Sequence, residues 1–243
     1  MERTCLRAQP LAHNLAIFSK YRHQVLRLGE VWGIIDTLFC GFEKEGCNLK
    51  AFQDRIRRDG KVLPGSIIKV DGFLNHRVDV QLLRELAQEF KKRFDLTGLT
   101  AVLTVEASGI ALATLCAEEF GVPLVFAKKA KSDNIEGGLY QSDIYSYTYK
   151  KKVTLLVSSQ WLGSGDRVLI VDDFLANGEA LRGLVEIVQK ADAELIGIGV
   201  AVEKGFQSGG EKLRAAGYKL ESLAVIEQAD ENGFVFRREG QHA

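Results

Sequence analysis

Two adjacent carboxylates, Asp172 and Asp173, follow an apolar run and precede a loop of small residues. The pattern at residues 168–180 predicts a buried strand, a tight loop and then a helix. Ligands of open parallel sheets bind at the carboxyl ends of the strands. The loop amides and the helix start favour a phosphate, whereas two carboxylates suit hydroxyls or a magnesium-bound polyol just beyond it. The motif predicts a sugar-phosphate site; the alternative is an acid pair that only caps a helix.

A regular alternation of strands and helices must position this motif, and it begins at Leu49. Apolar residues at helical spacing predict a short helix after Asn48 and a longer one over residues 79–95. Residues 61–65 read as a turn. Short apolar strands separated by helices predict an α/β fold with a mostly parallel sheet covered on both faces. The remaining expected strands are 67–70, 101–105, 124–127, 167–171, 195–202 and 218–227, and the remaining helices end near 120 or span 178–191 and 208–216.

A polar, glycine-containing stretch interrupts the alternation at residues 128–143. Residues 144–149 then alternate as in a two-sided strand, and a second strand is expected over residues 153–157. A loop and hairpin inserted into an alternating array are often functional, for example as a lid. Lys128, Lys129 and Lys131 are the candidates to act in such a lid; a solvated surface loop is the alternative.

Composition excludes several classes of protein. The 243 residues carry 32 basic and 32 acidic side chains, and this neutrality argues against a protein that coats nucleic acid or anionic membranes. No apolar run is long enough to span a bilayer. Four irregularly spaced cysteines fit neither a disulfide scaffold nor a zinc site, which indicates a reduced, cytoplasmic protein. Residues 1–48 lack a clear pattern, and we expect an extension outside the domain, with the start assigned upstream of the true one.

The motif resembles the signature of the type I phosphoribosyltransferases, and other segments extend the likeness from Leu49 to the carboxyl terminus. Residues 106–110 follow a core strand as the family's pyrophosphate loop does, and residues 126–131 resemble its flexible loop. Residues 69–76, 172–178 and 198–207 match the branch of the family that acts on xanthine. The resemblance implies the type I phosphoribosyltransferase fold: a mostly parallel twisted sheet with helices on both faces, a small hood and a flexible-loop hairpin.

The resemblance also implies a reaction, in which the phosphoribosyl group of PRPP is transferred to N9 of xanthine to give XMP and pyrophosphate. It implies Mg²⁺ as the cofactor that accompanies PRPP, and a homodimer. Asp172 and Asp173 would engage the ribose hydroxyls, directly or through Mg²⁺. The implied PRPP contacts are Ala176, Asn177, Gly178, Glu179 and Ala180 for the 5′-phosphate, Ser108 and Gly109 for the pyrophosphate, and Lys129; those for xanthine are Ile68, Asn75 and Lys204, with Phe174 and Phe206 as candidates to stack on the purine.

Alternative functions remain open at this point. Adenine or guanine/hypoxanthine transfer would use the same acid pair, although adenine has no C2 substituent and would leave Lys204 unpaired. A PRPP-sensing purine repressor would need residues 1–48 as a DNA-binding domain. That segment has six Lys and Arg against five Asp and Glu, a poor phosphate-binding surface. In the phosphate loop, many family members have threonines and a second glycine where this chain has Asn177, Glu179 and Ala180. Glu179 must direct its carboxylate away from the phosphate.

Overall fold

The computed structural model describes residues 49–129, 138–146 and 151–238; the expected extension, residues 1–48, lies outside them, as does Lys131. A central sheet has the spatial order β10-β9-β8-β7-β3-β4, and its neighbouring strands are parallel except for the β9–β10 pair. The expected mostly parallel sheet is therefore confirmed. Its strands are β3 (Ala101–Val105), β4 (Leu124–Ala127), β7 (Arg167–Leu175), β8 (Glu194–Lys204), β9 (Leu220–Asp230) and β10 (Gly233–Phe236).

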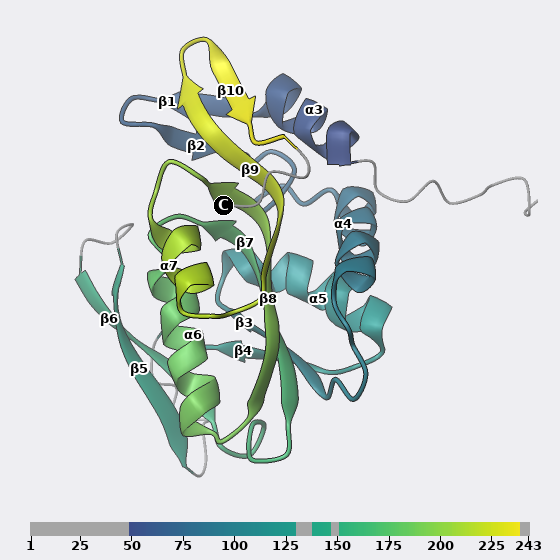
Figure 1. The fold of residues 1–243 in the computed structure, drawn as a ribbon, viewed down its shortest axis with the longest axis vertical. Coiled ribbons are helices and arrows are strands. Elements are labelled where there is room, and N and C mark those ends of the chain that lie inside the picture. Colours follow the sequence, from purple (N-terminus) through teal and green to yellow (C-terminus); the bar gives the residue numbers. More distant parts are fainter. Residues whose placement is uncertain (1–48, 130–137, 147–150, 239–243) are drawn as a thin grey trace, which may run out of the picture. The chain divides into compact units, whose positions relative to one another are not determined.

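Helices cover both faces of this sheet (Figure 1). Successive strand residues point to opposite faces, so that Val102 joins an apolar cluster with α4 and α5 while Leu103 joins a second cluster with α6. Both clusters are built from side chains that are almost fully buried. The helices of the described residues are α3 (Leu49–Asp59), α4 (Val80–Arg93), α5 (Ser108–Phe120), α6 (Glu179–Lys190) and α7 (Gly209–Ala215).

A hairpin of β5 (Leu139–Ser146) and β6 (Lys151–Ser158) forms a separate two-stranded sheet beside α6 (Figure 1). The expected inserted hairpin is confirmed, but its first strand begins five residues earlier than the sequence suggested. Residues 139–143 pair with residues 154–158, and this pairing extends the strand through polar residues. A single bridge between Lys128 and Leu156 connects the hairpin to the segment that follows β4. The end of the expected strand, residues 147–149, lies outside the described residues.

The prediction of a turn at residues 61–65 is wrong in part, because a second hairpin forms there. Strand β1 (Lys61–Leu63) pairs with β2 (Ile67–Lys69), and the turn between them contains Gly65 and Ser66, both with positive φ. Strand β10 was also not expected from the sequence. Both of these strands are short, and pairing with a neighbour stabilises them more than their own composition does.

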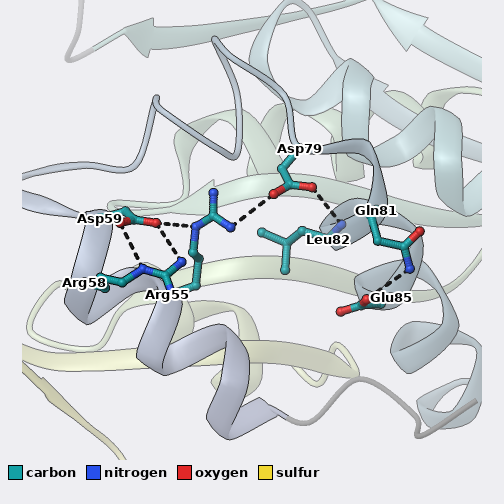
Figure 2. Close-up of polar contacts among 7 residues, drawn as sticks. All are labelled: Arg55, Arg58, Asp59, Asp79, Gln81, Leu82 and Glu85. Carbon is teal, nitrogen blue, oxygen red and sulfur yellow. Dashed lines mark hydrogen bonds and ion pairs between the residues drawn. The ribbon is translucent and has the colours of Figure 1, made fainter.

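Polar contacts tie the first described helix to the start of α4 (Figure 2). The Arg55 guanidinium on α3 forms ion pairs with Asp59 and Asp79, the latter at 3.1 Å. The other oxygen of Asp79 caps α4 by accepting the Leu82 amide at 3.2 Å. The Asp79 amide donates to the Phe73 carbonyl at 2.9 Å, and Arg55 lies 5.2 Å from the Phe73 ring centroid. Arg55 therefore contacts both ends of the turn between Phe73 and Asp79.

Candidate active site

Strand β7 carries the two carboxylates into the interior. Asp172 is 4% exposed and Asp173 is 2% exposed. The strand was expected to end at residue 171, but it continues to Leu175, whose register partner is Glu203 on β8. The neighbouring strand β8 runs on to Lys204, so backbone pairing extends β7 through the acids although their side chains are polar. The acids therefore lie within the strand, and successive side chains point to opposite faces.

Asp173 brings together two residues that were expected to contact different substrates. Its Oδ2 accepts the Asn75 side-chain amide at 2.6 Å, and its Oδ1 accepts the Ser108 hydroxyl at 2.8 Å. Asn75 comes from the segment before α4, and Ser108 is the first residue of α5. The candidate base contact, ribose contact and pyrophosphate contact thus meet at one carboxylate.

Asp172 lies against the turn between β3 and α5. A side chain at Gly109 would place its Cβ 2.5 Å from Asp172 Oδ1 and 2.4 Å from Thr104 Oγ1, so only glycine allows this approach. Asp172 Oδ1 also accepts the Asp173 amide at 3.0 Å. Burial, followed by the charge of Asp173, raises the pKa of the Asp172 carboxyl well above its usual range. Asp172 is therefore harder to ionise than an ordinary aspartate.

The loop after β7 leads into α6 through Gly178, whose φ of 82° favours glycine. Gly178 is the N-cap residue of α6 and has no side chain to cap the first amides. Glu179 pairs with Arg182 at 3.2 Å, one turn further along the helix. Because this pairing directs the carboxylate along α6, the loop amides at residues 176–180 can donate hydrogen bonds to an anion.

Lys204, one of the candidate base contacts, is the last residue of β8. Lys204 is half-buried, its Nζ lies 5.8 Å from the Phe174 ring centroid, and burial lowers its pKa. Ile68 on β2 is buried in the apolar cluster against which Phe174 packs, whereas Phe206 is exposed. The structure therefore brings Lys204 and Phe174 together, while Asn75 points toward Asp173.

Three features of the site were not expected from the sequence. Glu106 accepts the Lys129 amide at 2.6 Å and so connects the turn after β3 to the start of the loop after β4. Glu203 forms a buried ion pair with Arg214 on α7, and Gly209 on α7 contacts the phosphate loop. A charged residue directly after the apolar run of residues 198–202 was the available signal for Glu203.

The acid pair is the candidate for a metal site. Within the described ranges, no three His, Cys, Asp or Glu side chains gather into a group that could hold a metal ion. Mg²⁺ in phosphate chemistry is usually held by one or two carboxylates plus substrate oxygens. The two neighbouring carboxylates Asp172 and Asp173 fit that donor set when a phosphorylated substrate supplies the rest. No helix among the described residues is both long enough and apolar enough to cross a membrane.

Acids in a central strand, a glycine loop at a helix start and an inserted hairpin form, in this α/β protein, a candidate sugar-phosphate site at the carboxyl end of the sheet. The phosphoribosyl transferase domain family matches residues 70–227, and the chain belongs to that family.

Individual relatives resemble the chain more specifically than the family as a whole does. The chain is 50% identical over 191 residues to a xanthine phosphoribosyltransferase of Lachnoclostridium phytofermentans, covering 78% of this chain and 98% of the relative. It is 49% identical over 183 residues to the xanthine phosphoribosyltransferase of Bifidobacterium animalis subsp. lactis, covering 75% and 95%. Among solved structures, adenine phosphoribosyltransferase of Trypanosoma brucei has a TM-score of 0.62 at 21% identity, covering 78% of this chain and 85% of that one. The structural likeness confirms the expected type I fold.

Proposed function

We propose that this protein is a purine-salvage enzyme that transfers the 5-phosphoribosyl group of PRPP to N9 of xanthine, giving XMP and pyrophosphate. The observation that carries the proposal is the convergence of Asn75 and Ser108 on Asp173, beside a loop suited to a phosphate. Support for the base comes from relatives named xanthine phosphoribosyltransferase that match over nearly their whole length.

The reaction breaks the bond between C1 of the ribose and the pyrophosphate oxygen, forms a bond from C1 to N9, and releases the imidazole proton of xanthine to solvent. Positive charge develops on the ribose and negative charge on the departing pyrophosphate, so positioning and electrostatics dominate catalysis. Asp173 and Asp172 accept the ribose hydroxyls, and the negative charge of the pair stabilises the ribose cation. Ser108 and Gly109 donate to the pyrophosphate, and the loop at residues 176–180 holds the 5′-phosphate. Mg²⁺, held with PRPP by the acid pair, would neutralise charge on the leaving group.

Asn75 and Lys204 carry the choice of base. Asp173 occupies one N–H of the Asn75 amide, which leaves its carbonyl oxygen and a second N–H for the base. Neighbouring carbonyl and N–H groups of xanthine match that pair. Lys204 offers only donors, and xanthine supplies carbonyl acceptors at C2 and C6. Adenine has an amino donor at C6 and nothing at C2, so the half-buried ammonium would stay unpaired, at a cost of about 1–3 kcal/mol.

The sheet edge at β4 supports the expected homodimer. Phe126 is 38% exposed and Trp161 is 69% exposed, and both line a groove of about 540 Å³ beside this edge strand. Exposed apolar groups that gather in one place often mark protein interfaces. We propose a cytoplasmic homodimer that uses this face, and the measured molar mass in solution, with Trp161→Asp as the variant, tests it.

A spectrophotometric assay with PRPP, Mg²⁺ and each of xanthine, hypoxanthine, guanine and adenine tests the reaction. We expect turnover mainly with xanthine, and its loss in Asp173→Asn. Turnover with adenine in place of xanthine would retain the mechanism but contradict the base assignment. Absence of turnover with every base, together with tight salt-sensitive binding of purine-operon DNA, would instead indicate a PRPP-sensing repressor.

A further inference from the structure

Glu203 is a buried acid for which the proposed reaction has no use. Its side chain is 3% exposed, and it lies on β8 directly before Lys204. Both of its oxygens accept from the Arg214 guanidinium, at 2.9 and 2.7 Å, and Ser222 on β9 donates to Oε2. Burial alone would raise the pKa of Glu203, but the hydrogen bonds from Arg214 and Ser222 outweigh burial and lower it. Glu203 is therefore an ionised anchor for Arg214.

Arg214 connects this anchor to α7, a helix of seven residues. So short a helix has little stability of its own, and its N-cap residue, Ser208, makes no side-chain cap hydrogen bond. The ion pair also lies directly over the first turn of α7. A Cβ at Gly210 would come within 1.9 Å of Glu203 Oε1 and 2.7 Å of Arg214 Nη1. The bidentate pair thus fixes where α7 lies against the end of β8.

The other end of this arrangement is the phosphate loop. A Cβ at Gly209 would lie 2.2 Å from the Ala176 carbonyl oxygen and 2.8 Å from both the Asn177 carbonyl carbon and the Gly178 nitrogen. In the other direction, a Cβ at Gly178 would lie 3.2 Å from the Gly209 Cα. These contacts are with backbone atoms, which cannot rotate away as the end of a flexible side chain can. The backbone of α7 therefore packs directly against the backbone of the loop at residues 176–178.

We propose that Glu203, Arg214 and Gly209, together called the α7 clamp, are positioning residues that set the affinity for PRPP. The ion pair fixes α7, and Gly209 lets the backbone of α7 approach the loop at residues 176–178 closely enough to hold its amides in place. The clamp acts through the loop and makes no contact with the substrate itself. This inference rests on the proposed function, because the loop matters to affinity only if it binds the 5′-phosphate.

Gly209→Ala is the first test, since the new methyl group must displace the phosphate loop. We expect the KM for PRPP and its Kd from calorimetry to rise about tenfold or more, while the KM for xanthine changes by less than about twofold. Gly163→Ala is the matched control, because nothing lies within 4 Å of a Cβ there. Equal PRPP affinities in these two variants would overturn the proposal.

Variants of the ion pair provide a second test that adds no bulk. Glu203→Gln and Arg214→Lys should each weaken PRPP binding several-fold, and Arg214→Lys should be the milder because it keeps the charge but loses the bidentate geometry. Glu194→Gln is the control, since Glu194 forms an equally bidentate but exposed pair with Arg167 at the other end of β8.

Hydrogen exchange at the loop amides separates positioning from general stability. We expect faster exchange at residues 177–178 in Glu203→Gln, with protection of β3 unchanged. Unchanged PRPP affinity in both ion-pair variants would overturn the role of the pair. If the parent chain binds no PRPP and turns over no base, the proposed function fails, which is a different result from a working parent whose clamp variants behave like their controls.

Discussion

Replacing Lys204 by Met should lower activity and raise stability at the same time. The methionine keeps most of the apolar stem, which lies by Phe174, and removes the ammonium. A hydrogen bond to a charged group contributes about 1.5–3 kcal/mol, so kcat/KM for xanthine should fall roughly tenfold to 150-fold. The slower turnover with adenine should rise, because the substitution removes an ammonium that adenine leaves unpaired.

The stability effect has the opposite sign because burial lowers the pKa of Lys204. A lysine with a lowered pKa in the folded state destabilises that state wherever it is charged, below the folded-state pKa. This destabilisation decreases as the pH rises from the folded-state pKa of Lys204 to its pKa in the unfolded chain. Lys204→Met should therefore raise Tm at neutral pH, and the gain over the parent should shrink at alkaline pH.

The assay is the initial rate with varied xanthine at saturating PRPP, combined with thermal unfolding at neutral and alkaline pH. Lys92→Met is the control, because Lys92 is an exposed lysine of α4 that pairs with Glu89 on the same helix. If Lys204→Met keeps kcat/KM for xanthine within about twofold of the parent, Lys204 does not contact the base and does not determine which purine is used.

Three further changes test other parts of the structure. Gly109→Ala should destabilise the fold by about 1–3 kcal/mol in urea unfolding, because its Cβ would overlap two buried oxygens; a variant as stable as the parent would contradict that packing. Arg55→Met should lower Tm by a few degrees, because it releases Asp79 and the adjoining turn. It should also raise the KM for xanthine more than the KM for PRPP. Equal changes in both KM values would refute a link between this turn and xanthine binding. Glu203 has a lowered pKa, so its pair with Arg214 stabilises the fold above the carboxyl pKa of the unfolded chain, and this stabilisation is lost as the pH falls through the folded-state pKa. Glu203→Gln should therefore reduce the loss of stability at acidic pH. An unchanged loss of stability at acidic pH would count against the pair.

The regular elements could be predicted from sequence because apolar periodicity is a local signal. Strands β3 and β4 were expected at the bounds that the structure has, and α4 differs by one or two residues at its ends. The ends of strands depend on their partners. β7 continues through Asp172 and Asp173 because β8 continues beside it, and no pattern within residues 167–175 contains that information.

The residues of the candidate site could be predicted from the sequence, but the contacts between them could not. The acid pair and the glycine loop stand out in the sequence, and the resemblance supplied Ser108, Asn75 and Lys204. The hydrogen bond between Asn75 and Asp173 joins residues 98 positions apart, and it depends on how the turn before α4 packs. The Glu203–Arg214 pair joins a strand to a helix across tertiary packing, which periodicity within one element cannot reveal.

The spatial order of the sheet has a consequence for synthesis of the chain. Strand β3 lies between β4 and β7, yet β7 begins 66 residues after β3 in the sequence. At about 5–20 residues per second, β3 waits roughly 3–13 s on the ribosome with an unpaired edge, which is open to non-native pairing. The strand that then covers this edge is the one that carries Asp172 and Asp173. Covering of the β3 edge and arrival of the two acids are therefore a single event in the maturation of the protein.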